Sequence, residues 1–338
     1  MLTHNHQPLY RFVLRDALLI SWRNKFLWFL GFFVALLGNG GAYEIIIRSL
    51  DRALLQSLLG SENIPSIFGA LSKLKDLVLR SASIRPLLEF ILMITILVVL
   101  VILYFLFSSA AMAATILAVK KLLKKQSVTL LDSVRASLPH LVHVFSINVL
   151  VKILVSLIIA GSTLPLGLFL AKSKLIFGLF YIITFIVLIS LGLAASFLAV
   201  YAACNSVFEK NHVIRALRGG WEIFTRHIII SVEMALLLFF LNLVLTLVLL
   251  TILVSLGGVF GFILTLLAAL KLKFAFWIVT VLGVLFFASL FIAAGSFFGA
   301  FQLTSWTILY TKLVRGEALS KIVRLAARLP EYLRLKRV

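Results

Sequence analysis

Long apolar stretches alternate with short polar segments along the whole chain. Six of them reach or approach the length of about 20 residues that a helix needs to cross the hydrocarbon core of a bilayer. The predicted spans are residues 26–40, 87–119, 141–160, 175–206, 228–256 and 274–310. The pattern therefore predicts an all-α fold, a polytopic transmembrane helix bundle with about six spans.

Two parts of this pattern allow a second interpretation. Residues 26–40 are the shortest span, and their length also suits a cleaved signal peptide. Asp16 and two amphipathic turns precede this span, which argues against the signal peptide. Residues 259–270 cover only about half a span. We expect them to be interfacial or re-entrant, with an extra crossing as the alternative.

The longest segment between spans, residues 41–86, also shows helical periodicity. Apolar residues recur at helical spacing in two runs, which Ile64-Pro65-Ser66 separates. We expect an extracytoplasmic segment of two helices that lie along the membrane or cap the bundle.

Composition supports the membrane assignment. Of the 338 residues, 62% are hydrophobic and 13% are charged, and the mean hydropathy is +1.16. Soluble domains have about 25% charged residues. Since no polar block is long enough for a separate soluble domain, we expect residues 1–338 to form one integral membrane domain.

The basic residues predict the orientation. The chain holds 32 Lys and Arg against 12 Asp and Glu, a formal net charge of +20. If the N-terminus is inside, the inner segments hold about twice as many basic residues as the outer ones, as expected for cytoplasmic loops. We therefore expect residues 1–25 and the basic tail 311–338 to be cytoplasmic. Because the basic residues lie between apolar runs, they favour anionic lipid over nucleic acid as a partner.

A short pattern recurs before three of the spans, at residues 17–22, 133–138 and 216–221. Each copy has a small residue, an apolar one, two variable positions, a small residue and a large apolar one. The pattern predicts a threefold repeat of an amphipathic interfacial helix followed by two membrane helices. The alternative is that any helix approaching a bilayer carries such residues.

Tryptophan and basic residues mark the predicted lipid interface. Trp prefers the head-group level, and neighbouring Lys and Arg reach anionic phosphates. After the last span, an apolar stripe with basic residues on its other side predicts a tail helix on the inner leaflet. The residues predicted to contact lipid are Trp22, Arg23, Lys25, Trp221, Arg226, Lys321, Arg324 and Arg328.

Residues 207–221, which read VFEKNHVIRALRGGW, and the span after them are similar to part of a known membrane domain. This domain is found on some bacterial glycerophosphodiester phosphodiesterases and in related integral membrane families, and the resemblance covers about two thirds of the chain by pattern. In the phosphodiesterases the domain accompanies a soluble catalytic domain. We expect no such domain in these residues, and therefore no hydrolase activity. Gly220 stands where the family leads us to expect a serine.

Three polar residues inside the spans form a candidate intramembrane site. Lys152 is predicted near mid-depth, Asn148 lies one turn earlier on the same helix face, and Glu233 lies near the inner end of the fifth span. Buried ionisable groups in membranes are costly and often functional. A transporter or channel for a small solute, with a site around these residues, is therefore the alternative function. The structural alternative is hydrogen bonding between helices.

Catalytic and metal-binding motifs are not found in the sequence. Cys204 is the only cysteine, and no Glu or Cys accompanies His140 and His143 at ligand spacing. The pairs Gly257 and Gly261, and Gly295 and Gly299, are better explained by close helix packing.

We therefore expect no enzyme activity, no cofactor and no metal site. The main prediction is a protein of the bacterial cell membrane that organises or senses lipid, or a partner, at the cytoplasmic face. The sequence leaves open whether the protein binds a protein partner or forms a homo-oligomer.

Overall fold

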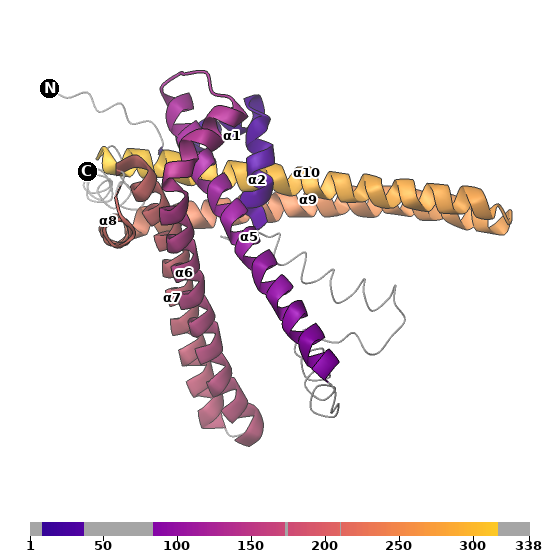
Figure 1. Cartoon of the computed structure of the whole chain (residues 1–338), viewed down its shortest axis with the longest axis horizontal. Helices are drawn as coiled ribbons and strands as arrows, with labels where there is room; N and C mark the ends of the chain where they lie inside the picture. Colours follow the sequence, from indigo (N-terminus) through magenta and orange to yellow (C-terminus); the bar gives the residue numbers. More distant parts are fainter. Residues whose placement is uncertain (1–8, 37–83, 173–174, 210, 317–338) are drawn as a thin grey trace, which may run out of the picture.

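The structure is a computed structural model that describes residues 9–36, 84–172, 175–209 and 211–316 (Figure 1). These residues form helices and no strand, which confirms the predicted all-α fold. The helices are α1 (Leu9–Arg23), α2 (Phe26–Leu36), α5 (Ile84–Leu123), α6 (Leu130–Lys172), α7 (Leu175–Glu209), α8 (Val213–Arg226), α9 (Ile228–Ala269) and α10 (Lys273–Val314).

Five helices are long and apolar enough to cross a membrane: α5, α6, α7, α9 and α10. Helices α1 and α2 meet at a bend of 113° and pass the same test together, which gives up to six crossings. The 42 residues of α9 extend about 63 Å at 1.5 Å per residue. A hydrocarbon core is only about 30 Å thick, so these helices exceed a single crossing.

The helices meet in one packed region, which we call the hub. It contains α1, α2 and α8, the C-terminal halves of α5, α7 and α10, and the N-terminal halves of α6 and α9 (Figure 1). The remaining halves extend away from it as arms. Helices α6 and α7 form one paired arm, α9 and α10 form another that diverges from it, and α5 lies between them.

The two regions differ in their side chains. Apolar side chains of the arms are exposed, as at Leu97 (50%), Phe262 (70%) and Val284 (63%). In a bilayer such side chains face lipid. The hub is rich in buried Ala, Ser and Gly, which lets helix backbones approach closely.

Close approach is clearest between α2 and α10. A Cβ atom added at Gly31 would lie 2.1 Å from the Ser296 carbonyl oxygen, and one at Gly299 would lie 2.3 Å from the Gly31 carbonyl oxygen. Predicted close packing at Gly299 is thus confirmed. By contrast, Gly257 and Gly261 on the arm of α9 have no neighbour within 4 Å of the added atom.

Residues 259–270 are not a separate re-entrant segment or an extra crossing, because α9 continues to Ala269 and a short turn leads into α10. Lys271 makes this turn with a φ of 56°. That residues 259–270 lie at the membrane interface stays a prediction. The two glycines at 257 and 258 do not interrupt α9, since in lipid no water competes for the backbone hydrogen bonds.

Two of the three predicted interfacial helices are separate elements, α1 and α8. The third is not, because residues 133–138 belong to the continuous helix α6, where Ser133 and Ser137 are buried. The threefold repeat therefore stays a prediction. The predicted outer segment up to residue 83, the end of the first span and the tail from residue 317 lie outside the described residues.

Candidate functional site

The centre of the candidate site is α8, which packs against α7 through small residues. A Cβ atom added at Gly220 would lie 2.7 Å from the backbone nitrogen of Ala202, and one at Gly219 would lie 2.1 Å from Nδ2 of Asn205. The backbones of the two helices are therefore in contact. A serine at position 220, as in the family resemblance, would require α8 to move away from α7.

Aromatic packing completes the buried face of α8. Phe224 is 5% exposed, and its ring stacks on Phe197 of α7 with 5.4 Å between the centroids. Trp306 of α10 also contacts Phe197, at 5.4 Å. These rings hold α8 in a defined rotation on the hub, so the direction of its opposite face is fixed.

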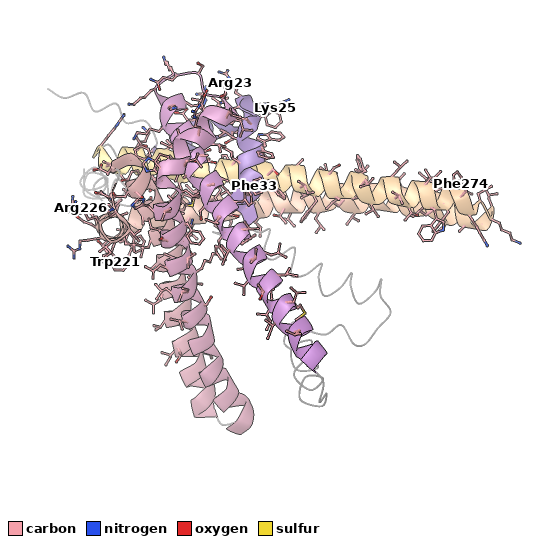
Figure 2. The ribbon with its side chains drawn as sticks, in the orientation of Figure 1. Arg23, Lys25, Phe33, Trp221, Arg226 and Phe274 are labelled. Atoms are coloured by element: carbon pink, nitrogen blue, oxygen red, sulfur yellow. The ribbon has the colours of Figure 1, made fainter. Side chains whose placement is uncertain are left out.

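The opposite face of α8 carries large apolar and basic side chains. Ile214 is 77% exposed and Trp221 is 49% exposed. Figure 2 shows Trp221 and Arg226 projecting from the outside of the hub. The Arg226 guanidinium donates to the Glu222 carboxylate over 3.0 Å, and both side chains are exposed. Arg215 and Arg218 are exposed as well. Tryptophan with arginine is the composition expected at a lipid interface.

A second Trp and basic patch lies at the bend between α1 and α2. Trp22 is 60% exposed and contacts Trp28 with 5.6 Å between ring centroids. Both indoles contact Phe297 of α10, and the Trp28 indole N–H donates to the Ser21 carbonyl oxygen over 2.8 Å. The predicted contacts Arg23 and Lys25 are exposed at this bend (Figure 2). Their predicted counterparts in the tail, Lys321, Arg324 and Arg328, lie outside the described residues.

Two lysines of the hub pack on aromatic rings. The Nζ atom of Lys120 lies 4.4 Å from the centre of the Phe208 ring, and that of Lys312 lies 4.4 Å from the centre of the Phe12 ring. Such cation–π contacts stabilise by about 0.5–1 kcal/mol at exposed sites. The sequence did not indicate these pairs, because their members lie far apart along the chain.

Asn148 of the predicted intramembrane site is buried between α5 and α6. Its Nδ2 atom donates to Ser109 Oγ over 3.1 Å and contacts Met112 Sδ at 3.6 Å. Lys152 lies one turn later and is half-buried, directly after Val151, which packs on α7. Lys152 therefore lies at the edge of the hub, where the exposed arm of α6 begins.

Glu233 joins α9 to α1. The Tyr10 hydroxyl of α1 donates to the Glu233 carboxylate of α9. Two residues before Glu233 on α9, the hydroxyl of Ser231 lies 2.8 Å from the hydroxyl of Tyr201 on α7. Asn148 is thus hydrogen-bonded to α5, and Glu233 is hydrogen-bonded to α1.

His227 forms the joint between α8 and α9. Burial, and secondly the neighbouring Arg226, lower the pKa of His227 from its ordinary value. Its backbone N–H donates to the carbonyl oxygens of Ile223 and Phe224, which closes α8. The joint therefore favours the neutral imidazole.

The sequence analysis missed a contact between two histidines. His143 of α6 and His212, the residue before α8, are 3.3 Å apart between Nε2 and Nδ1. They are separated by 69 positions, so no local motif could reveal them. Among the described residues, no group of three or more His, Cys, Asp or Glu side chains is arranged to hold a metal ion.

Comparison of the chain with protein-family models, with curated proteins and with solved structures finds no match. The resemblance to the phosphodiesterase membrane domain therefore stays a prediction.

Proposed function

We propose that this is a non-enzymatic, multi-pass protein of the bacterial cell membrane that organises or senses anionic lipid at the cytoplasmic face. The observation that carries the proposal is the two-sided construction of α8. One face is fixed to the hub by Gly219, Gly220 and Phe224, and the other presents Trp221 with exposed arginines. A helix of this kind lies at the head-group level.

The charge of α8 supports a preference for anionic lipid. A Lys or Arg near an anionic membrane surface contributes about 1 kcal/mol. Arg215, Arg218 and Arg226 are exposed, and Glu222 offsets one of them. A net attraction of about 2 kcal/mol would enrich anionic lipid beside α8 several-fold to tens-fold. This range suits reversible recruitment of lipid.

The distribution of charge along the long helices supports the orientation, with both termini in the cytoplasm. Between Glu233 and Lys271, α9 carries no charged residue. On α6, Lys152 at the edge of the hub and Lys172 at the end of the arm are 20 residues apart, or about 30 Å, which matches the hydrocarbon thickness. Most of the basic residues in the part of the chain that the structure describes lie in the hub, and we therefore place the hub on the inner side.

Lipid binding to matched charge variants tests the proposal. The variant R218Q/R226Q removes two charges from α8, and K271Q/K273Q removes two from the far end of the α9–α10 arm. Both would be reconstituted in nanodiscs that contain equal amounts of phosphatidylcholine and phosphatidylglycerol. Lipids retained by the protein would then be counted by native mass spectrometry.

We expect R218Q/R226Q to retain at least threefold less phosphatidylglycerol than the natural protein, and K271Q/K273Q to change retention little. Equal retention by all three proteins would contradict the proposal. So would an equal loss in both variants, because the effect would then follow net charge rather than α8.

The transporter alternative has less support. It would use Asn148, Lys152 and Glu233 as one site, whereas the buried amide of Asn148 already donates to Ser109 of α5, as expected for a residue that packs two membrane helices together. The position of Lys152 at the edge of the hub is also a place where a lysine reaches head groups. For these reasons we prefer the lipid interface.

A further inference from the structure

The contact between His143 and His212 joins two helices at the hub surface. The imidazole nitrogens Nε2 of His143 and Nδ1 of His212 are 3.3 Å apart, and the ring centroids are 5.4 Å apart. His143 is half-buried on α6 beside the fully buried Val144, and His212 is exposed. A ligand can therefore reach the pair from outside while one of its members is held by the hub.

The backbone on both sides of His212 is also held. The His212 carbonyl oxygen accepts a hydrogen bond from the Ala216 N–H over 2.9 Å, the first bond of α8. On the other side, Asn211 Nδ2 donates to Asn205 Oδ1 over 2.8 Å, and Ser206 Oγ donates to the Asn211 carbonyl oxygen over 3.3 Å. The last turn of α7 thus positions His212 opposite α6.

We propose that His143 and His212 bind a divalent transition metal ion of the zinc or copper class. Two imidazole nitrogens at about 2.0–2.1 Å from a tetrahedral Zn²⁺ lie about 3.3–3.4 Å apart. The observed separation of 3.3 Å agrees with this value. The imidazole that donates in the contact between the two histidines takes its other tautomer, with its proton on the ring nitrogen that faces away, and both rings rotate so that the two lone pairs point at the metal. Imidazole is a preferred ligand of zinc, copper and nickel.

Water fills the remaining coordination positions, because no third protein ligand is arranged around the pair in the described residues. The metal is therefore exchangeable and held more weakly than in a four-ligand structural site.

Metal binding would cross-link α6 to the beginning of α8. Helix α8 carries the exposed face with Trp221, so the site would fix the helix that we propose to contact lipid. The metal site goes beyond the proposed function and does not depend on it, because its evidence is the geometry of two imidazoles.

Copper binding to histidine variants tests the site. The full chain would carry H4Q and H6Q in every sample and a purification tag without histidine, so that the N-terminal histidines and the tag do not compete. Cu²⁺ would be titrated into the protein in nanodiscs. The electron paramagnetic resonance spectrum counts coordinated nitrogens by their superhyperfine lines, and the titration gives the affinity.

We expect two nitrogens in the unmodified site and one in H143Q or H212Q, with affinity at least tenfold lower in each. The matched control H227Q removes the histidine at the other end of α8 and should bind within twofold of the parent. H140Q, one turn from His143, should also bind like the parent.

Three results would overturn the proposal. Equal affinity in all variants would mean an adventitious ion only. A loss in H140Q but not in H212Q would place the metal on α6 alone. A failure of Zn²⁺ to raise the melting temperature of the parent above that of H143Q, with equal melting temperatures in chelator, would show that α6 and α8 are not cross-linked.

Discussion

At the scale of single residues, glycine decides where the helices of the hub touch. Gly31, Gly220 and Gly299 each lie against the backbone of another helix, whereas Gly257 and Gly261 face open space. The pair Gly295 and Gly299 has the same small-xxx-small spacing as the pair Gly257 and Gly261, so the sequence predicted close packing for both pairs. Only the three-dimensional arrangement separates a glycine that packs in the hub from one that faces outward on an arm.

This difference gives a matched pair of substitutions. Gly299→Leu places a side chain where even a Cβ atom would lie 2.3 Å from the Gly31 carbonyl oxygen, so α2 and α10 must separate. We expect the free energy of unfolding to fall by about 1–3 kcal/mol. Gly257→Leu should be neutral or stabilising by up to about 1 kcal/mol, because leucine is the better helix former. Unfolding in mixed detergent micelles measures both, and equal losses would contradict the prediction.

The hydrogen bond of Asn148 can be measured in the same way. Its partner is Ser109 Oγ at 3.1 Å, and both residues are buried. Hydrogen bonds between membrane helices contribute about 0.6 kcal/mol on average and up to about 1.7 kcal/mol. A double-mutant cycle of Asn148→Ala and Ser109→Ala should give a coupling energy in this range. A coupling of zero would argue that Asn148 serves something other than the packing of α5 and α6.

His227 makes stability depend on pH. Burial and Arg226 lower its pKa in the folded state, so the unfolded state binds the proton more readily and acid favours unfolding. The stabilising contribution is complete above the unfolded pKa of about 6.5 and is lost as the pH falls through that value toward the folded pKa. Melting temperatures at about pH 7.5 and 5.5 should differ more for the natural protein than for His227→Gln. An equal difference would contradict this assignment.

At the scale of elements, hydropathy predicted which segments are apolar but not where each helix ends. The predicted third span begins at residue 141, yet α6 begins at Leu130 and includes Pro139. The predicted fifth span stops at residue 256, yet α9 continues to Ala269. Charged residues and glycines mark where a chain leaves the apolar region, whereas the backbone hydrogen bonds of a helix continue through such positions when nothing competes for them.

The length of the α9–α10 arm predicts a dependence on bilayer thickness. Beyond Asn242, its last buried residue, α9 continues for 27 residues to Ala269, which is about 40 Å. A straight segment of this length fits a core of about 30 Å only at a tilt of about 41°, and membrane helices tilt by about 40° at most. A thicker bilayer relieves this mismatch. We expect a higher melting temperature in nanodiscs of long-chain erucoyl lipid than in nanodiscs of short-chain myristoleoyl lipid. The opposite order would mean that part of the arm lies outside the hydrocarbon.

At the scale of the whole molecule, the all-α membrane architecture followed from the sequence, but the division into hub and arms did not. The contact between Tyr10 and Glu233 joins residues 223 positions apart, and the contact between His143 and His212 joins residues 69 positions apart. No periodicity along the chain reports such pairs. Trp221 and Arg226, by contrast, stand out from the local Trp and basic pattern of their own helix, and both are exposed. Among the described residues, the long-range hydrogen bonds and the cation–π contacts therefore gather in the hub, whereas the arms expose mainly apolar side chains.

The single cysteine has a practical consequence. Cys204 is fully buried in the hub, whereas the arms expose many of their side chains. The folded natural chain should therefore be silent toward maleimides, and one new cysteine at an exposed position would carry the only accessible thiol. Spin labels and fluorophores could then map the depth of each arm in the bilayer without first replacing Cys204.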